Sequence, residues 1–354
     1  MKAGSRTEPI TREPEAKRDV TCCLLSWINV HGQVHFGNLC KKIDFSSSLE
    51  TTDRATEQGR PPPPCRMSSS ARPLAAVCQL TVTSDKEANF SACERLVEEA
   101  KERGACMVFL PENFDYIGSS PEETLSLCES LTGETVSRYT RLARKLGVWL
   151  SLGGFHERGH DWESDRRIYN THVIIDDKGG VVSVYRKSHL FDVELPEKGV
   201  SLKESAFTLP GPSLVPPVQT PIGKVGLATC YDLRFPELSL ALRRRGAEVL
   251  TFPSAFTVAT GAAHWEVLLR ARAIENQCFV LAAAQVGRHN EKRRSYGHAL
   301  AVDPWGEVLA DCGGEEPGVA LVEIDLEKVA GTRRNMPVQR HRRDASFYRG
   351  LEES

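Results

Sequence analysis

From about residue 74 onward, short apolar segments alternate with longer amphipathic ones, and this alternation constrains the fold more than any other feature of the chain. The apolar segments have the length of buried strands. The amphipathic segments repeat apolar residues with the spacing of helices that lie on a sheet. The pattern predicts an α/β protein in which helices cover sheets.

The expected elements follow one another along the chain. A helix is expected to begin at Ser84, where Glu87 completes a capping box, and to end near Gly104. Further helices are expected over about 135–145, 236–245 and 263–276, and strands over 148–152, 168–176, 181–185, 248–252 and 279–284. Hairpin turns are expected at DKGG (177–180) and DPWG (303–306).

Residues 1–70 differ in composition from the rest, because they are polar and irregular and include four consecutive prolines at 61–64. We expect a disordered or targeting extension there, a folded domain over 71–348 and a tail over 349–354. The apolar stretch at 20–30 lies too far in for a signal peptide, and the acidic residues before it argue against a transit peptide. Met67 is a candidate second start site that would retain the whole folded domain.

Charge and cysteine content exclude some classes of partner. The formal charge of −2 gives no electrostatic reason to expect nucleic acid or an anionic membrane. No apolar run approaches the roughly 18 residues of a membrane-spanning helix. The eleven cysteines form an odd set without a Cys-x-x-Cys pair, which favours a reducing compartment. No dinucleotide or P-loop fingerprint occurs, so no cofactor is expected.

Cys230 is a candidate nucleophile because it follows an apolar run at 225–229 and precedes an expected helix. The N-terminus of a helix offers free N–H groups and a partial positive charge, which stabilise a thiolate and the oxyanion formed when sulfur attacks a carbonyl. A lone cysteine is more often a small buried hydrophobe, and that alternative stands beside the catalytic one.

Two other expected strands also end at a charged residue. Glu112 leaves the apolar segment 105–110 after Pro111, and Lys187 leaves the segment 181–185. A carboxylate beside a thiol can accept its proton, and a nearby ammonium stabilises negative charge on sulfur or on a substrate oxygen. Taken alone, each residue is interpreted more readily as a solvated loop residue, because charged side chains are seldom buried unless paired.

Taken together, these segments resemble the Glu-Lys-Cys motifs of the nitrilase, or carbon–nitrogen hydrolase, superfamily. The matching strings are LPENF (110–114), YRKSHL (185–190) and CYDLRFPE (230–237), and the resemblance runs from about residue 74 to about residue 348. GGFHER (153–158), AAHWE (262–266) and DPWG (303–306) are most similar to the Nit branch. Ala262 stands where the branch pattern has proline.

The resemblance implies an α-β-β-α sandwich, in which two sheets pack face to face with helices outside, and a homodimer. It implies hydrolysis through a thioester, with Cys230 as nucleophile, Glu112 as proton acceptor and Lys187 as proton donor or oxyanion stabiliser. The backbone N–H of Tyr231 would join Lys187 at the oxyanion. A supporting carboxylate is expected in the loop after the lysine, where Glu204 matches best, and Glu194 and Glu197 remain alternatives.

The same resemblance implies a substrate pocket whose cation or hydroxyl receives a carboxylate. Arg234 and Thr260 match family positions for that role, although an arginine serves a structural ion pair equally well. The expected pocket residues are Arg234, Thr260, Tyr231, Phe114, Tyr116, Phe256 and His264.

The implied function is a hydrolase of linear amides that converts the primary amide of deaminated glutathione to an acid and ammonia, a metabolite-repair reaction. One alternative is an ω-amidase acting on α-ketoglutaramate or a related small amide, and another is a non-catalytic scaffold with the same fold. The resemblance implies a cytoplasmic protein, with a mitochondrial form if the N-terminal extension targets it there.

Two rival motifs compete with this interpretation. HERGH (156–160) matches the H-E-x-x-H zinc pattern, but three nearby glycines disfavour the helix that the motif requires, so no metal is expected. Alternatively, His189 or His264 could activate Cys230, as in cysteine proteases. That arrangement would leave Glu112 and Lys187 without a role.

Overall fold

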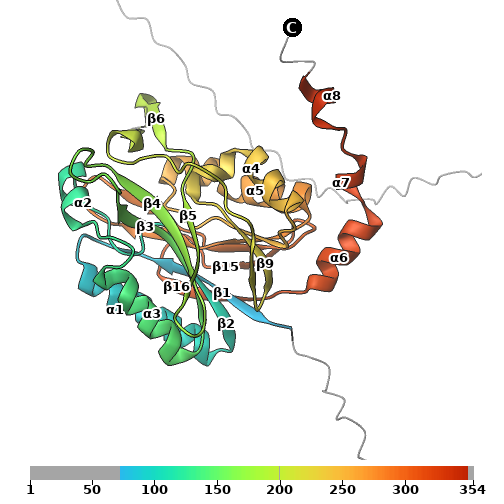
Figure 1. The fold of residues 1–354 in the computed structure, drawn as a ribbon, viewed down its shortest axis with the longest axis horizontal. Coiled ribbons are helices and arrows are strands. Elements are labelled where there is room, and N and C mark those ends of the chain that lie inside the picture. The colour runs from blue at the N-terminus through green and yellow to red at the C-terminus, as the bar shows by residue number, and fades with distance from the viewer. Residues whose placement is uncertain (1–71, 199, 350–354) are drawn as a thin grey trace, which may run out of the picture. The chain divides into compact units, whose positions relative to one another are not determined.

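The computed structural model describes residues 72–198 and 200–349, and the expected extension over 1–70 lies outside them. In the described part, two large β-sheets pack face to face, with helices on their outer faces (Figure 1). The α-β-β-α sandwich predicted from the sequence is therefore confirmed.

The first sheet has the strand order β13-β12-β1-β2-β3-β4-β5, and β16 pairs with β1. Its strands are β1 (Leu74–Leu80), β2 (Ala105–Leu110), β3 (Trp149–Arg158), β4 (Ile168–Ile175), β5 (Val181–Arg186), β12 (Ala284–Arg288), β13 (Arg294–Tyr296) and β16 (Gly318–Glu323). Because β1, β2 and β3 are parallel, the residues that follow β2 emerge at the carboxyl edge of this sheet. Glu112 lies there.

The second sheet has the order β15-β14-β11-β10-β9-β8. Its strands are β8 (Val218–Thr220), β9 (Gly223–Leu227), β10 (Val249–Thr251), β11 (Phe279–Ala282), β14 (Leu300–Val302) and β15 (Val308–Asp311). The central strands β9, β10 and β11 are parallel, so the segments after β9 and β10 meet at one edge. Cys230 and Ala255 follow these two strands. A separate hairpin consists of β6 (Asp192–Leu195) and β7 (Val200–Lys203).

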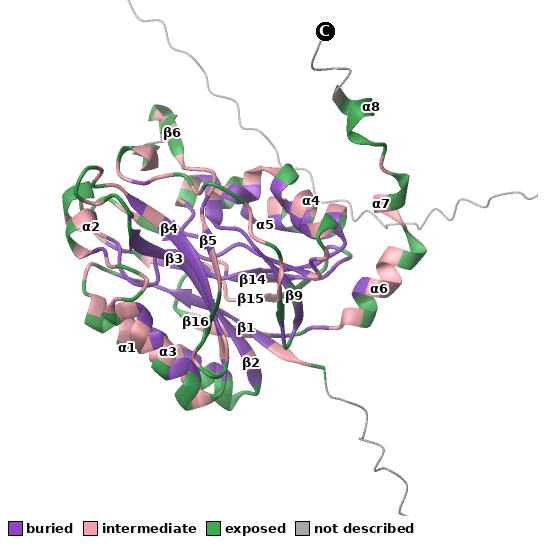
Figure 2. Ribbon diagram, viewed as in Figure 1, coloured by how far each residue is buried: buried purple, intermediate pink, exposed green. Residues whose placement is uncertain are grey.

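Side-chain alternation along the strands separates the two layers of the core. In β1, Ala75 and Val77 belong to the cluster between the two sheets, whereas Ala76 and Cys78 belong to the cluster under the helices of the first sheet. Successive side chains of a strand point to opposite faces, and both faces of this strand are covered. Figure 2 accordingly shows buried strands surrounded by helices with exposed outer surfaces.

Each sheet has its own pair of covering helices. α1 (Lys86–Glu102) and α3 (Glu134–Leu146) pack on the first sheet, and α4 (Pro236–Arg244) and α5 (Val258–Asn276) pack on the second. A short helix, α2 (Pro121–Leu127), follows the Glu112 segment. The C-terminal part forms α6 (Leu326–Asn335), α7 (Val338–His341) and α8 (Ala345–Arg349). None of the helices in the described ranges has the length and apolar character needed to cross a membrane.

Three sequence expectations need correction. The cap of α1 is Asp85 rather than Ser84, because its carboxylate accepts the N–H groups of Glu87 and Ala88. Helix α5 begins at Val258 rather than at 263, because Thr257 caps it. The apolar run 279–284 is divided between two sheets, since β11 ends at Ala282 and β12 begins at Ala284. Buried strands of the two sheets have the same apolar composition, so the sequence does not show that the chain passes from one sheet to the other at this point.

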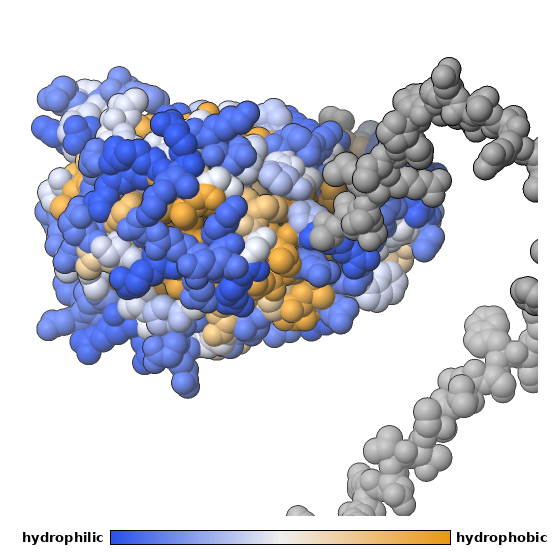
Figure 3. All heavy atoms as spheres, turned by 90° about the horizontal axis from the view of Figure 1, so that it is seen from below, coloured by the Kyte–Doolittle hydropathy of each residue, from blue (hydrophilic) through white to orange (hydrophobic). Residues whose placement is uncertain are grey.

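Exposed apolar side chains are few on a largely polar surface. Figure 3 shows one face, on which hydrophilic side chains surround a smaller apolar area. Among the described residues, the most exposed large hydrophobic side chains include Val267 at 69% and Trp305 at 64%.

Candidate active site

Glu112 is held at the edge of the first sheet by an irregularity in its neighbour β3. The pairing register between β3 and β4 shifts between Leu152 and Phe155, where Gly154 has a φ of 72°. A Cβ atom on Gly154 would lie 2.7 Å from Cγ of Glu112. Glycine therefore lets the backbone approach the carboxylate closely in a conformation that other residues rarely adopt.

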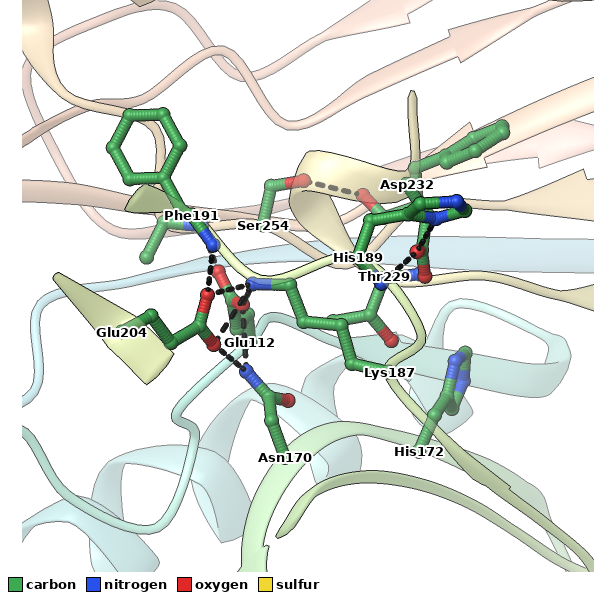
Figure 4. Close-up of polar contacts among 12 residues, drawn as sticks. Glu112, Asn170, His172, Lys187, His189, Phe191, Glu204, Thr229, Asp232 and Ser254 are labelled. Atoms are coloured by element: carbon green, nitrogen blue, oxygen red, sulfur yellow. Dashed lines mark hydrogen bonds and ion pairs between the residues drawn. The ribbon is translucent and has the colours of Figure 1, made fainter. Parts of the chain in front are cut away.

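Lys187 follows β5 directly, and its side chain is almost fully buried. Its Nζ atom lies 3.1 Å from Oε1 of Glu112 and 2.8 Å from Oε2 of Glu204. Nδ2 of Asn170 in β4 donates to Oε1 of Glu112 at 2.8 Å and to Oε1 of Glu204 at 3.3 Å. Figure 4 shows these four side chains turned toward one another. The ammonium is thus shared between two carboxylates that an amide also bridges.

Cys230 lies after β9 with a φ of 47°, in the left-handed region that residues other than glycine seldom occupy. Its backbone N–H donates to the carbonyl of Pro253 at 3.0 Å, and burial and the nearby carboxylate of Glu112 raise the pKa of its thiol. The expected helix over 236–245 is present as α4, which starts at Pro236, and a short 3-10 turn, η3 (Cys230–Arg234), lies between the cysteine and that helix. Pro236 favours the first turn of a helix, and this displaces the helix start from the cysteine.

A third carboxylate, that of Asp232, was missed in the sequence analysis and joins the nucleophile segment to the lysine segment. Asp232 is fully buried and accepts hydrogen bonds from the hydroxyl of Tyr185 at 2.8 Å and from the backbone N–H of Thr229 at 2.9 Å. His189 contributes its Nδ1 at 2.7 Å and its backbone N–H at 3.1 Å. The available signal was the spacing of Thr229 and Asp232, three residues apart, which is that of a capping box.

Charges inside the site decide which groups are ionised. Burial opposes ionisation of Glu112, but the Lys187 ammonium, the Cys230 thiol and Asn170 outweigh it, so the pKa of Glu112 lies below its ordinary value. Burial also lowers the pKa of Lys187, but Glu112 and Glu204 more than offset this and hold it well above the usual lysine value. Burial and the Glu112 carboxylate raise the pKa of Cys230, despite the opposing effect of Lys187. The resting pair is a thiol beside a carboxylate.

The backbone N–H of Ala255, which follows β10, completes this arrangement. It donates to Oε2 of Glu112 at 2.9 Å, and Pro253 in the same segment accepts the backbone N–H of Cys230. The ends of β2, β9 and β10 therefore meet at the segment 253–255, although they are distant along the chain.

Among the three candidate supporting glutamates, Glu204 is the one beside Lys187. Its Oε2 also accepts the backbone N–H of Phe191 at 2.6 Å. Glu194 and Glu197 are exposed, and Glu194 accepts a hydrogen bond from Ser201. The loop that carries Glu204 folds back over the lysine segment, since the backbone N–H of Glu204 donates to the carbonyl of Phe191.

Several expected pocket residues lie near the nucleophile. The guanidinium of Arg234 lies 5.5 Å from the ring centre of Phe256 and 5.7 Å from that of Tyr231, and its Nη1 is 3.3 Å from Nδ1 of His264. No carboxylate of the described residues pairs with Arg234, so the structural ion-pair alternative is not seen in this part of the chain. The hydroxyl of Thr260 lies 2.8 Å from that of Thr257 at the start of α5.

Two of the expected pocket residues, Phe114 and Tyr116, do not lie beside Arg234 and Phe256. Phe114 is fully buried between the first sheet and its helices, where its ring packs edge-on against Tyr139. The ring of Tyr116 stacks on His156, and its hydroxyl donates to the carbonyl of Thr124. These aromatic residues follow Glu112 closely in sequence, but the chain turns them into the core rather than toward Cys230.

The contacts of the two rival motifs differ from what those motifs require. His156 and Glu157 belong to strand β3, and His156 is paired with Asp115, so the zinc-binding helix is not formed. The described ranges contain no cluster of three His, Cys, Asp or Glu side chains suited to a metal. The Nδ1 of His189 is held by Asp232, and the group that most raises the pKa of the Cys230 thiol, after burial, is Glu112.

Comparisons with known proteins agree with this geometry. A family model described as carbon–nitrogen hydrolase matches residues 74–334. Deaminated glutathione amidase of Homo sapiens is 61% identical over 276 residues, which cover 78% of this chain and 84% of that protein. The crystal structure of the Caenorhabditis elegans NitFhit protein is 51% identical with a TM-score of 0.73, covering 78% of this chain and 66% of that one.

A more distant structure is informative about the cysteine. It is a point mutant of the amidase from Nesterenkonia sp. AN1, with acrylamide added at its active-site cysteine. It is 26% identical with a TM-score of 0.61 and covers 75% of this chain and 98% of that one. On the family match over most of its length, and on the identity with these relatives, the chain belongs to the carbon–nitrogen hydrolase family.

Proposed function

We propose that the protein is an amidase that hydrolyses deaminated glutathione through a thioester on Cys230. The observation that carries the proposal is the meeting of Cys230 and Glu112 on the segment 253–255, where burial and the carboxylate that Lys187 and Asn170 keep ionised raise the pKa of the thiol. The identity of 61% with a relative named for this activity supports the choice of substrate.

In the first half of the reaction, Glu112 accepts the thiol proton as the sulfur of Cys230 attacks the amide carbonyl. The raised pKa of the thiol makes this transfer necessary, because a preformed thiolate is disfavoured beside an ionised carboxylate. The ammonium of Lys187 and the backbone N–H of Tyr231 then stabilise the oxyanion of the tetrahedral intermediate. A donor in that role contributes about 3–4 kcal/mol to the transition state.

Collapse of the intermediate requires a proton on the leaving nitrogen, and Glu112 carries the proton it has just accepted. The same carboxylate then removes a proton from water that attacks the thioester, which restores the starting state. Glu204 supports both halves by holding Lys187 in place from the loop over the site.

The leaving group depends on the substrate. Glutathione is a tripeptide whose glutamyl side chain forms an amide with cysteinylglycine, and it contains no primary amide. Hydrolysis of that amide in the deaminated form releases the dipeptide amine. The ammonia expected in the sequence analysis would therefore arise only from primary amides such as α-ketoglutaramate.

The test is a panel of substrates offered to the wild-type protein and to Cys230→Ala. We expect the wild type to release cysteinylglycine from deaminated glutathione faster than ammonia from α-ketoglutaramate, and the variant to be inactive on both. Preference for α-ketoglutaramate would make the protein an ω-amidase instead. Absence of turnover on every amide would favour a scaffold.

We further propose a homodimer formed through the exposed face of α5. Val267 and Ile274 lie two turns apart on this helix, and the neighbouring hairpin exposes Trp305. Together they form an apolar area that a second copy would cover. Light scattering should report a monomer for Val267→Glu and a dimer for the control Val181→Glu, which changes an exposed valine of β5.

We also propose that this amidase works in the cytoplasm, with a mitochondrial form if the N-terminal extension targets it. All seven cysteines in the described part of the chain are free, as a reducing compartment would keep them. Fractionation of cells that express the full chain, beside a version beginning at Met67, would test both statements.

A further inference from the structure

The turn between β12 and β13 places a second arginine at the edge of the active site. Ser295 of β13 pairs with Thr257, and the backbone N–H of Tyr296 donates to the carbonyl of Phe256 at 3.0 Å. The segment that receives these contacts begins at Ala255, whose own N–H contacts Glu112. The hairpin is thus attached to the segment that also contacts the base.

Strand alternation directs neighbouring arginines of this hairpin to opposite sides. Ser295 is buried, and its hydroxyl lies 2.8 Å from Nε2 of His289, which reaches the carbonyl of Val82 through Nδ1. Arg293 is two residues before Ser295 and so shares its inward face, whereas Arg294 takes the outward face. Accordingly, Arg293 is half-buried and Arg294 is exposed.

The positive charge of Arg293 affects two buried groups, Glu112 and His289. It is among the groups that lower the pKa of Glu112, after Lys187 and Cys230, and together with burial, which is the larger effect, it lowers the pKa of His289 to about 4. The hydrogen bonds of Arg293 involve its backbone, whose N–H donates to Oδ1 of Asn290 and whose carbonyl accepts from His289. Within the described residues, no carboxylate pairs with its guanidinium.

We propose that Arg293 binds a carboxylate on the amine side of the scissile amide, so that the protein prefers peptide-like amides with a free C-terminus over small amides. The proposal rests on the amidase function above. A guanidinium is suited to this role because its planar donors match the geometry of a carboxylate.

The hairpin that carries Arg293 is attached to the segment after Ala255, whose N–H contacts Glu112, so we place Arg293 on the Glu112 side of the site and assign it to the leaving group. Glu112 must reach the departing nitrogen in order to protonate it, so the leaving group lies on the Glu112 side of the sulfur. Arg234, by contrast, lies four residues after Cys230 with its guanidinium near Tyr231 and Phe256. Deaminated glutathione carries two carboxylates, one on the keto acid and one on glycine. Arg234 takes the first and Arg293 takes the second.

The test compares Arg293→Gln with Arg294→Gln, which removes the same charge from the adjacent outward position. Three substrates are used: deaminated glutathione, its C-terminal carboxamide, and α-ketoglutaramate, which lacks the second carboxylate. For Arg293→Gln we expect kcat/KM on deaminated glutathione to fall roughly tenfold to a hundredfold, the usual contribution of a charge-assisted hydrogen bond. The activities on the carboxamide and on α-ketoglutaramate should change little, and Arg294→Gln should resemble the wild type throughout.

Each outcome decides the proposal. If Arg293→Gln lowers kcat/KM equally on all three substrates, the arginine acts through Glu112 or on the keto-acid carboxylate, and the assignment is wrong. If it matches Arg294→Gln, the residue has no role in recognition, while the amidase function stands. If the wild type does not cleave deaminated glutathione, the proposed function itself fails. Arg293→Lys, which keeps the charge, should recover part of the lost preference and shows that folding is not the cause.

Discussion

Oε2 of Glu204 lies 2.8 Å from Nζ of Lys187, and both side chains are largely shielded, with exposed fractions of 14% and 2%. Glu112 shares the same ammonium at 3.1 Å. One buried cation thus lies between two carboxylates, and at Glu112 it opposes the effect of burial, which by itself would favour the protonated form. The proposed mechanism and the stability of the fold therefore involve the same three side chains.

Replacement of Lys187 should therefore affect both properties. In Lys187→Met, two carboxylates bridged by Asn170 lose their counter-ion, so we expect kcat to fall by roughly 10²–10³ through loss of the oxyanion donor. Unpaired buried charges should also lower the free energy of unfolding by about 3–5 kcal/mol at neutral pH. Urea unfolding would measure this, with Lys203→Met at an exposed position of β7 as the control. Adding Glu204→Gln should restore part of the stability and none of the activity, and recovered activity would contradict the proposed role.

Activity should fall on the acid side only at unusually low pH. The proposed base is the ionised form of Glu112, and its pKa is held below the ordinary glutamate value. A lowered pKa in the folded state means that Glu112 stabilises the fold above its unfolded pKa and loses this contribution as the pH falls through the folded value. The acid limb of kcat/KM should therefore lie below about 4.3, the value of a free glutamate. A limb near neutrality that persists in Glu112→Gln would show that another group is the base.

The alternation of strands and helices was sufficient to predict an α/β protein with helices on its sheets, because buried strands and amphipathic helices have distinct periods. The face-to-face packing of two sheets was predicted from the family resemblance instead. The convergence of Glu112, Lys187 and Cys230 came from a family resemblance, since nothing in their spacing shows that three strand ends meet. The turn at Cys230 and the position of Arg293 depend on tertiary contacts, which the sequence does not show. The turn between Cys230 and the expected helix at 236 is held by Asp232, which the sequence analysis did not single out, and Arg293 is recognisable only once β13 is placed beside Thr257.

The thiol of Cys230 should remain protonated through the range in which free cysteines titrate. Burial and the Glu112 carboxylate raise its pKa, so no thiolate should form near pH 8.5, about where an ordinary thiol loses its proton. The ultraviolet absorbance of thiolate, measured as the difference between the wild type and Cys230→Ser, should stay flat from neutral to mildly alkaline pH. In Glu112→Gln the same difference should rise at lower pH than in the wild type. A thiolate step in the wild-type protein near neutrality would refute the base mechanism.

Asp232→Asn should impair turnover more than binding. The carboxylate accepts hydrogen bonds from Tyr185, His189 and Thr229, and an amide of the same shape turns a donor toward at least one of these groups. The left-handed conformation of Cys230 would lose its support, so kcat should drop while KM stays within a few-fold of the wild type. Asp325→Asn, which alters the cap of α6, is the matched control. Equal losses in the two variants, or a change confined to KM, would mean that Asp232 does not position the nucleophile.

Gly154→Ala should lower activity far more than the added backbone strain alone would explain. Gly147 provides the comparison, because it also has a positive φ, of 58°, and a Cβ there meets no atom within 4 Å. Alanine at either position bears the strain of the left-handed region, about 1–2 kcal/mol. Only at position 154 does the added methyl group approach Cγ of Glu112 and Oδ1 of Asn170, at 2.7 and 2.9 Å. We therefore expect similar losses of melting temperature in the two variants, with kcat/KM nearly abolished in Gly154→Ala and preserved in Gly147→Ala. If both variants keep full activity, the close approach of β3 to Glu112 does not fix the position of the base.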